Sequence, residues 1–348
     1  MTSRNGDSVR HIDGFDNLRA FFSICVVTVH SGYIAPSDLF DKLRFESHVI
    51  CWSDIVDFDV LLLAVPVFAL ISCYLFAMKQ PGDERLGQRL LRTSRLLVFW
   101  MLLSFLSEKG LNASIQKLGL GILEAPFWFI ISAGDTIFYF FSALIVLLPL
   151  TSFAKRLKLR ASWGLFALSL AIVGFLPLIA VWLHVPALVH HANPLNFLPL
   201  AFAAVVMQAP PFKRNGQAAV WPGLAALAAG GLATALDWTV YRNGIVFEVN
   251  AFAVPAYTRP SVVLLAVAVV HLATLIRRPC GSVVRFMSRH SLALYCIHPF
   301  VLTVVYRILP RLQLAGPPRL VVCATTTVIA SYALALILPS FLRKDLLS

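Results

Sequence analysis

The chain has 348 residues, of which 59% are hydrophobic and 13% are charged, and its mean hydropathy is +0.79. This composition excludes an ordinary soluble domain, and the absence of strand-type alternation excludes an outer-membrane barrel. The net charge of +12 does not indicate nucleic acid, because Lys and Arg cluster at alternate ends of the apolar segments, as cytoplasmic loops require.

The apolar segments predict an all-α, polytopic membrane protein of about ten transmembrane helices, with both termini in the cytoplasm. We expect one domain over 1–348, with its helical core at about 14–341 and no fused soluble domain. A break around 109–126 is expected to form a re-entrant or interfacial piece. The predicted spans are 14–33, 57–78, 93–108, 127–152, 162–183, 194–209, 217–237, 260–276, 289–308 and 319–341.

The first span carries two ionisable residues, Arg19 and His30, eleven positions apart. Such side chains are costly inside a membrane, so each is expected to serve a function. They lie on nearly one helix face, about 16 Å apart along the axis, and one extended molecule could touch both. Asp16, one turn before Arg19, is expected to hold the guanidinium. His30 suits general-base work, and a structural hydrogen bond to a carbonyl is its alternative.

Four arginines, Arg85, Arg89, Arg92 and Arg95, enter the third span with spacings of four, three and three. Most of them share one helix face. Arginines without lysine favour bidentate phosphate binding. Alternatively, these arginines only anchor the helix at the cytoplasmic side of the membrane, with the aliphatic parts of their side chains along the membrane surface.

The fourth span carries Trp128 near its start, then Asp135 and Tyr139 one helical turn apart. A belt of interfacial aromatic residues explains Trp128. It does not explain Asp135, which in lipid must be protonated, paired or facing water. We expect these three residues to contribute to substrate binding.

In the ninth span Ser291, Tyr295 and His298 recur at one helix face. His298 lies nine positions inside the cytoplasmic boundary, at about the depth of His30. Two histidines at one depth on separate helices predict a shared cavity, and the alternative is a seam of interhelical hydrogen bonds.

Metal binding is not predicted. His184, His190 and His191 lie together, but they have no acidic or Cys partner nearby in the sequence. The six cysteines are scattered without any Cys-x-x-Cys pair, which is typical of small residues packed in membrane helices.

Five elements in order resemble acyltransferase family 3. The run from Gly14 through Arg19 to His30 is similar to that family's opening helix, in which ten residues separate a basic residue from a His. Val65–Leu75 resembles the family's Ser-Gly segment, with Cys73 in place of Gly, and Arg89–Arg92 resembles its Arg-x-x-Arg element. Phe127–Phe129 resembles its Trp-Phe-Leu motif, and Ser291–Pro299 resembles its closing Ser-x-x-x-Tyr-x-x-His-Pro signature.

The resemblance implies a ten-helix protein of the bacterial inner membrane that moves an acyl group, usually acetyl from acetyl-CoA, to a hydroxyl. The implied acceptor is a cell-surface glycan or glycolipid precursor, or alternatively a small secondary metabolite. The expected partners are therefore membrane lipid, acyl-CoA and a glycan or lipid-linked sugar, with no nucleic acid.

On this basis we expect the four arginines to hold the phosphates of acetyl-CoA and His30 to take the proton of the acceptor hydroxyl. Direct transfer and a covalent acyl-histidine both remain open. Ser291, Tyr295 and His298 are expected to bind the acceptor or the developing oxyanion. The rival interpretations are a proton-coupled transporter or flippase of a glycan precursor and a structural scaffold, which would leave Arg19 and His30 unexplained.

Overall fold

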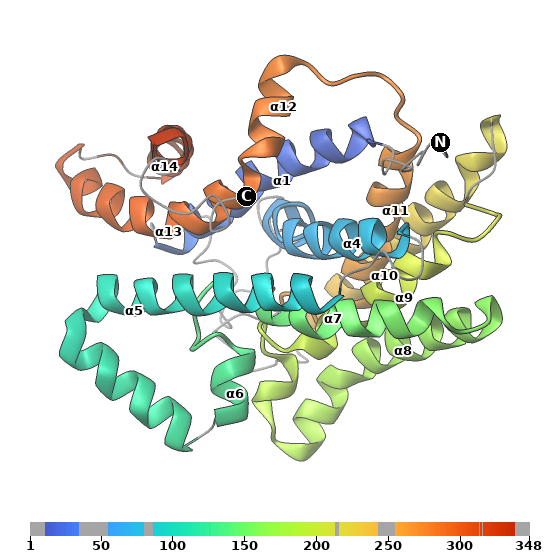
Figure 1. The fold of residues 1–348 in the computed structure, drawn as a ribbon, viewed down its shortest axis with the longest axis horizontal. Coiled ribbons are helices and arrows are strands. Elements are labelled where there is room, and N and C mark those ends of the chain that lie inside the picture. The colour runs from blue at the N-terminus through green and yellow to red at the C-terminus, as the bar shows by residue number, and fades with distance from the viewer. Residues whose placement is uncertain are drawn as a thin grey trace, which may run out of the picture.

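The computed structural model describes residues 11–34, 55–79, 86–124, 126–212, 216–242, 255–312, 314 and 316–337. The described residues are 83% helical and contain no strand, which confirms the all-α prediction. The helices are α1 (Asp13–Ile34), α4 (Ala64–Ala77), α5 (Leu86–Glu124), α6 (Pro126–Ile131), α7 (Tyr139–Lys155), α8 (Leu159–Leu183), α9 (Leu198–Val206), α10 (Trp221–Arg242), α11 (Pro260–Thr274), α12 (Ser282–Arg289), α13 (Ser291–Ile308) and α14 (Gly316–Ile337) (Figure 1).

Within the described residues, five short helical turns lie between these helices. The π-helical turn η1 (Val56–Leu61) leads into α4, and the 3-10 turns η2 (Pro186–Val189) and η3 (Pro194–Phe197) connect α8 to α9. Two further 3-10 turns are η4 (Gly216–Ala219), before α10, and η5 (Leu309–Leu312), after α13.

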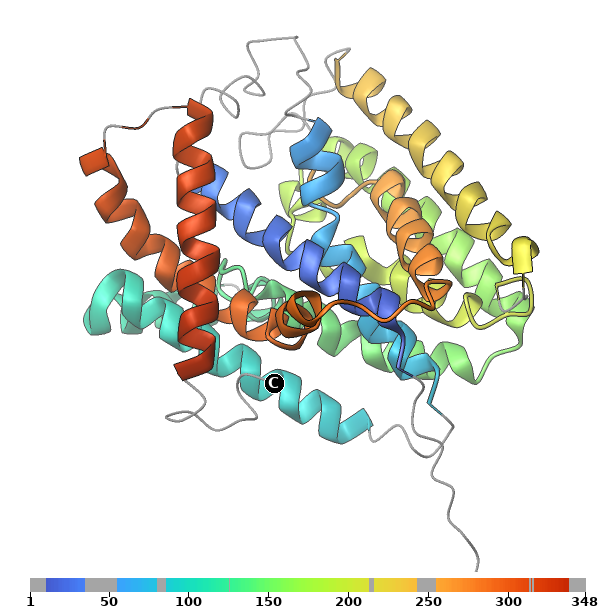
Figure 2. The same ribbon diagram turned by 90° about the horizontal axis from the view of Figure 1, so that it is seen from above.

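Six helical segments in the described residues are long and apolar enough to cross a membrane, as a multi-pass membrane protein requires. The first of them is 72% buried inside the molecule, whereas the span in α10 is only 17% buried and lies at the periphery (Figure 2). The six are Val56–Ala77, Leu86–Ser107, Leu159–Leu183, Gln217–Val240, Ser291–Ile308 and Pro318–Ile337.

Helix α1 runs through the middle of the molecule (Figure 2). It packs against α4, α11, α12, α13 and α14, which come from both ends of the chain. At Gly14 the approach to α11 is so close that a Cβ atom would lie 1.9 Å from the carbonyl oxygen of Ala273. The two backbones therefore touch, and only glycine fits at this position.

The predicted fourth span, 127–152, is interrupted. Between α6 and α7 the backbone passes through three consecutive left-handed residues, with φ of 51° at Ala133, 66° at Gly134 and 59° at Asp135. Left-handed conformations cost energy in residues other than glycine, so the surrounding structure must hold this turn in place. The expectation that Asp135 and Tyr139 lie one turn apart on one helix is therefore wrong, because Asp135 lies in the turn and Tyr139 begins α7.

The segment 109–126, predicted to be a re-entrant or interfacial piece, is helical as far as Glu124. This second part of α5 turns back toward α6 (Figure 1).

A buried ion pair joins η1 to α10 and α11. The Nη1 of Arg259 lies 2.8 Å from Oδ1 of Asp59, and both side chains are shielded from solvent. The Nη2 of Arg259 donates to the carbonyl of Phe58, and Nε1 of Trp238 donates to Oδ2 of Asp59 at 2.6 Å. Each charge therefore has several partners, which is the condition under which a buried pair is tolerated.

We expect Arg259→Met to lower the free energy of unfolding by about 3–5 kcal/mol, because Asp59 would remain as a buried charge without its cation. The measurement is the unfolding transition of the purified protein in detergent. Arg307→Met, at an exposed position of α13, is the matched control. A loss at Arg259 no larger than the control's would contradict a structural role for the pair.

Candidate active site

A cavity of about 580 Å³ opens between α1, α4, α5, α7, α12 and α13. It lies toward one end of the bundle, which we call the Arg19 end and which holds the start of α1, the end of α4 and the start of α5. The opposite end, called the His30 end, holds the end of α1, η1 and residues 190–191. The volume is in the range of small-molecule sites in proteins.

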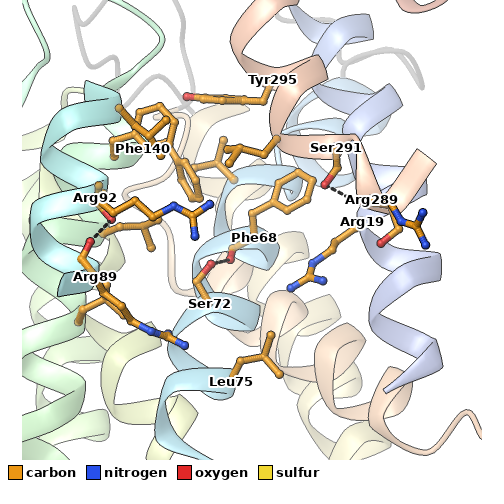
Figure 3. Close-up of a pocket in the computed structure, with 18 of the residues that line it drawn as sticks. Arg19, Phe68, Ser72, Leu75, Arg89, Arg92, Phe140, Arg289, Ser291 and Tyr295 are labelled. Carbon is orange, nitrogen blue, oxygen red and sulfur yellow. Dashed lines mark hydrogen bonds between the residues drawn. The ribbon is translucent and has the colours of Figure 1, made fainter. Parts of the chain in front are cut away.

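Arginines dominate the polar wall of this cavity. Figure 3 shows the guanidinium groups of Arg19, Arg89 and Arg92 directed into the same space from α1 and α5. Two further arginines of α12, Arg285 and Arg289, also line it. Arg89 is held in part by Phe76, because its guanidinium lies 5.2 Å from the centre of that ring.

Of the other two predicted phosphate-binding arginines, the structure describes Arg95 alone. Arg95 is exposed on α5 and is absent from the cavity wall. Arg85 lies outside the described residues.

The cavity wall has one carboxylate, that of Asp16, among the described residues. Its Oδ1 accepts a hydrogen bond from Ser288 at 2.6 Å, and its Oδ2 lies 2.9 Å from Nε2 of His11. Among the described residues no ion pair within 4 Å joins Asp16 to Arg19, but the two side chains interact electrostatically. Asp16 also holds α12 against α1 through its hydrogen bond with Ser288.

Beyond the arginines the cavity wall becomes apolar. Phe68, Leu96 and Leu144 lead from the guanidinium groups to Tyr295. Ser291 and Tyr295, two members of the predicted polar face, line the cavity, and Phe140 lies beside Tyr295 (Figure 3). The Tyr295 hydroxyl donates to the carbonyl of Ile137. The site therefore combines a mouth lined by guanidinium groups with a more apolar interior.

His30 and His298 meet in the interior, as their equal depth predicts. The ring centres are 5.2 Å apart, with 38° between the ring planes. His298 also lies 6.1 Å from the ring centre of Tyr295, which reaches the cavity. The histidine pair is therefore adjacent to the apolar end of the arginine-lined cavity.

The three predicted residues of the fourth span converge on the loop after α8. Trp128 contacts His190 edge-on, with ring centres 5.2 Å apart, and Tyr139 contacts His191 in the same way at 5.1 Å. The two histidines lie against each other, with ring centres 4.2 Å apart. Asp135 is exposed and interacts electrostatically with His190. This group (Trp128, Asp135, Tyr139, His190, His191) is called the aromatic–histidine cluster below.

Both loop histidines of the cluster are neutral at physiological pH. Burial, together with the neighbouring His190 and His30, lowers the pKa of His191 to about 3. Burial also lowers the pKa of His190, although Asp135 opposes this shift. Neutral imidazoles can both donate and accept hydrogen bonds, as a hydroxyl ligand requires.

Sequence reasoning missed four residues of these sites. Arg285 lies between two predicted spans and Arg289 begins the ninth, but their i, i+4 spacing in α12 was a usable signal. His190 and His191 were set aside because no acid lies near them in the sequence, and Asp135 reaches them only through the left-handed turn. No group of three or more metal-ligating side chains occurs among the residues that the structure describes.

Comparison with known proteins gives one match. Residues 12–336 match a family model described as an acyltransferase domain. No curated protein and no solved structure shows significant similarity to the chain.

Proposed function

The chain belongs to the family of this acyltransferase domain and is a membrane acyltransferase, and from that premise we propose that it transfers acetyl from acetyl-CoA to a hydroxyl of a cell-surface glycan or glycolipid precursor. The observation that carries the proposal is one cavity with five arginines at its mouth and the His30–His298 pair beyond its apolar end. A small secondary metabolite is the alternative acceptor. The proposed location is the bacterial cytoplasmic membrane, with the Arg19 end facing the cytoplasm.

The cavity suits an acyl-CoA because that donor has phosphates at one end and a thioester at the other. Five guanidinium groups around a single carboxylate favour a ligand with several negative charges. The apolar interior suits the pantetheine arm. The separation of about 16 Å along α1 between Arg19 and His30 then matches a donor bound in an extended form.

In the proposed reaction His30 takes the proton of the acceptor hydroxyl as its oxygen attacks the thioester carbonyl. The new C–O bond forms, the C–S bond breaks, and the proton passes from His30 to the CoA thiolate. The products are the acetyl ester and free CoA, and His30 returns to its neutral form. Tyr295 lies near the thioester end of the cavity and contributes to the wall around the reacting carbonyl.

We assign acceptor binding to the aromatic–histidine cluster at the His30 end. An aromatic face such as Trp128 can pack against the apolar face of a sugar ring, while neutral His190 and His191 and the exposed Asp135 can bond its hydroxyls. The electrostatic interaction of His191 with His30 indicates that this cluster lies near the base.

The test of the proposed function is release of free CoA from acetyl-CoA by the purified protein, in the presence of a mixed pool of glycan acceptors. Release that requires the intact protein, with transfer of acetyl to a member of the pool, is the expected result. Failure to bind acetyl-CoA at all would remove the donor from the proposal.

Trp128→Ala is expected to raise the KM for the acceptor by about five- to tenfold, because one aromatic stacking partner is worth roughly 1–1.5 kcal/mol. The KM for acetyl-CoA should not change. Trp221→Ala, at the start of α10, is the matched control, because Trp221 is 69% exposed and does not belong to the cluster. An unchanged acceptor KM in the Trp128 variant would refute this assignment of the acceptor site.

A further inference from the structure

The pairing of His298 with His30 carries an inference about how the base is oriented. His298 is fully buried on α13, and its ring lies 5.2 Å from that of His30 on α1. His30 is partly exposed. Of the two, His30 is therefore the ring that a ligand can reach, and His298 lies behind it.

The backbone of α13 fixes the tautomer of His298. Its Nδ1 lies 3.1 Å from the carbonyl oxygen of Leu294. A carbonyl can only accept, so Nδ1 must carry the proton, and in the neutral ring Nε2 then carries a lone pair. Pro299 lacks an N–H, which leaves the Tyr295 carbonyl without its helical donor, and this second carbonyl also interacts with the His298 ring.

The Nε2 of His298 is buried and has no hydrogen-bond partner among the described residues. A buried acceptor without a donor is costly, so a donor is expected nearby. The Tyr295 ring is close, but the single proton of its hydroxyl is donated to the carbonyl of Ile137. The neighbouring group with a proton to give is the imidazole of His30.

We propose that His298 is a positioning residue for the base: in the reacting complex its Nε2 accepts an N–H of His30, which leaves the lone pair on the other nitrogen of His30 directed to the acceptor hydroxyl. This inference rests on the proposed function. His298 keeps its own Nδ1 proton throughout. When His30 takes the acceptor's proton, the bond to His298 becomes charge-assisted and strengthens, so it stabilises the transition state more than the ground state.

The test compares His298→Gln with His298→Asn. A glutamine amide oxygen can reach the place of Nε2, whereas the shorter asparagine reaches only the place of Nδ1. With acetyl-CoA and the acceptor pool, His298→Asn should lower kcat by about 10²-fold with KM for acetyl-CoA unchanged. His298→Gln should recover kcat to within about tenfold of the natural protein.

The possible failures are distinguishable. If the natural protein releases no CoA, the proposed function itself fails. If the natural protein is active and both variants lose kcat equally, lose none, or change KM instead, the positioning role is wrong. If either variant no longer binds acetyl-CoA, the test is instead the unfolding midpoint of His30→Ala, of His298→Asn and of the double variant. A midpoint shift in the double variant equal to the sum of the two single shifts would show that the two rings do not interact.

Discussion

Replacing His30 by alanine is expected to slow release of CoA from acetyl-CoA by about 10²- to 10⁴-fold, the usual contribution of a general base. The affinity for acetyl-CoA should stay close to that of the natural protein. The physical reason is distance, because Arg19, at the end of the cavity that would bind the phosphates, lies about 16 Å along α1 from His30. The measurement is CoA release under saturating donor, together with the dissociation constant of acetyl-CoA.

The control for this variant is His184→Asn. His184 is exposed at the end of α8 in a left-handed conformation, with φ of 53°, and asparagine tolerates that conformation better than alanine. The control should retain full activity. Near-normal CoA release by the His30 variant would end the assignment of His30 as the base.

The double variant Arg89→Ala/Arg92→Ala is expected to raise the KM for acetyl-CoA by at least about 10²-fold, with a smaller effect on kcat. Hydrogen bonds to charged groups contribute roughly 1.5–3 kcal/mol each, so loss of two guanidinium groups is sufficient. The measurement is the donor dependence of CoA release at a fixed acceptor concentration.

Arg95→Ala provides the control that separates phosphate binding from membrane anchoring. Arg95 is an arginine of the same helix, near the same end of the bundle, but it lies outside the cavity. If the double variant acts through the cavity, Arg95→Ala should leave the donor KM unchanged. Equal effects of the two substitutions would indicate that all three arginines only anchor α5 in the membrane.

The sequence predicts the helical segments well because each is a long apolar run, which is a local property. Helix α1, α8 and α11 all begin or end within a few residues of the predicted spans. The interruption of the fourth span could not be predicted this way. Its left-handed turn at Ala133 and Asp135 depends on contacts with the rest of the fold, and a Cβ at Gly134 would lie 2.3 Å from the ring of Phe105.

The residues of the candidate site were likewise predictable from the sequence only in part. The pairing of His30 with His298 follows from helix depth, which the sequence encodes as a residue count. The partners of Asp16 do not, because Ser288 lies 272 positions away and α12 carries it back to α1. The ion pair of Asp59 and Arg259 was missed for the same reason. The two residues are far apart in the sequence and pair only because the fold brings η1 against the segment before α11.

The central place of α1 has a consequence for how the protein is made. The helix that carries Arg19 and His30 leaves the ribosome before four of its packing partners, α11, α12, α13 and α14. The contact of Gly14 with Ala273 cannot form until a further 259 residues have been synthesised. Nascent chains that stop before α13 therefore contain His30 without its neighbour, so the pair of His30 and His298 is completed only when α13 has been inserted.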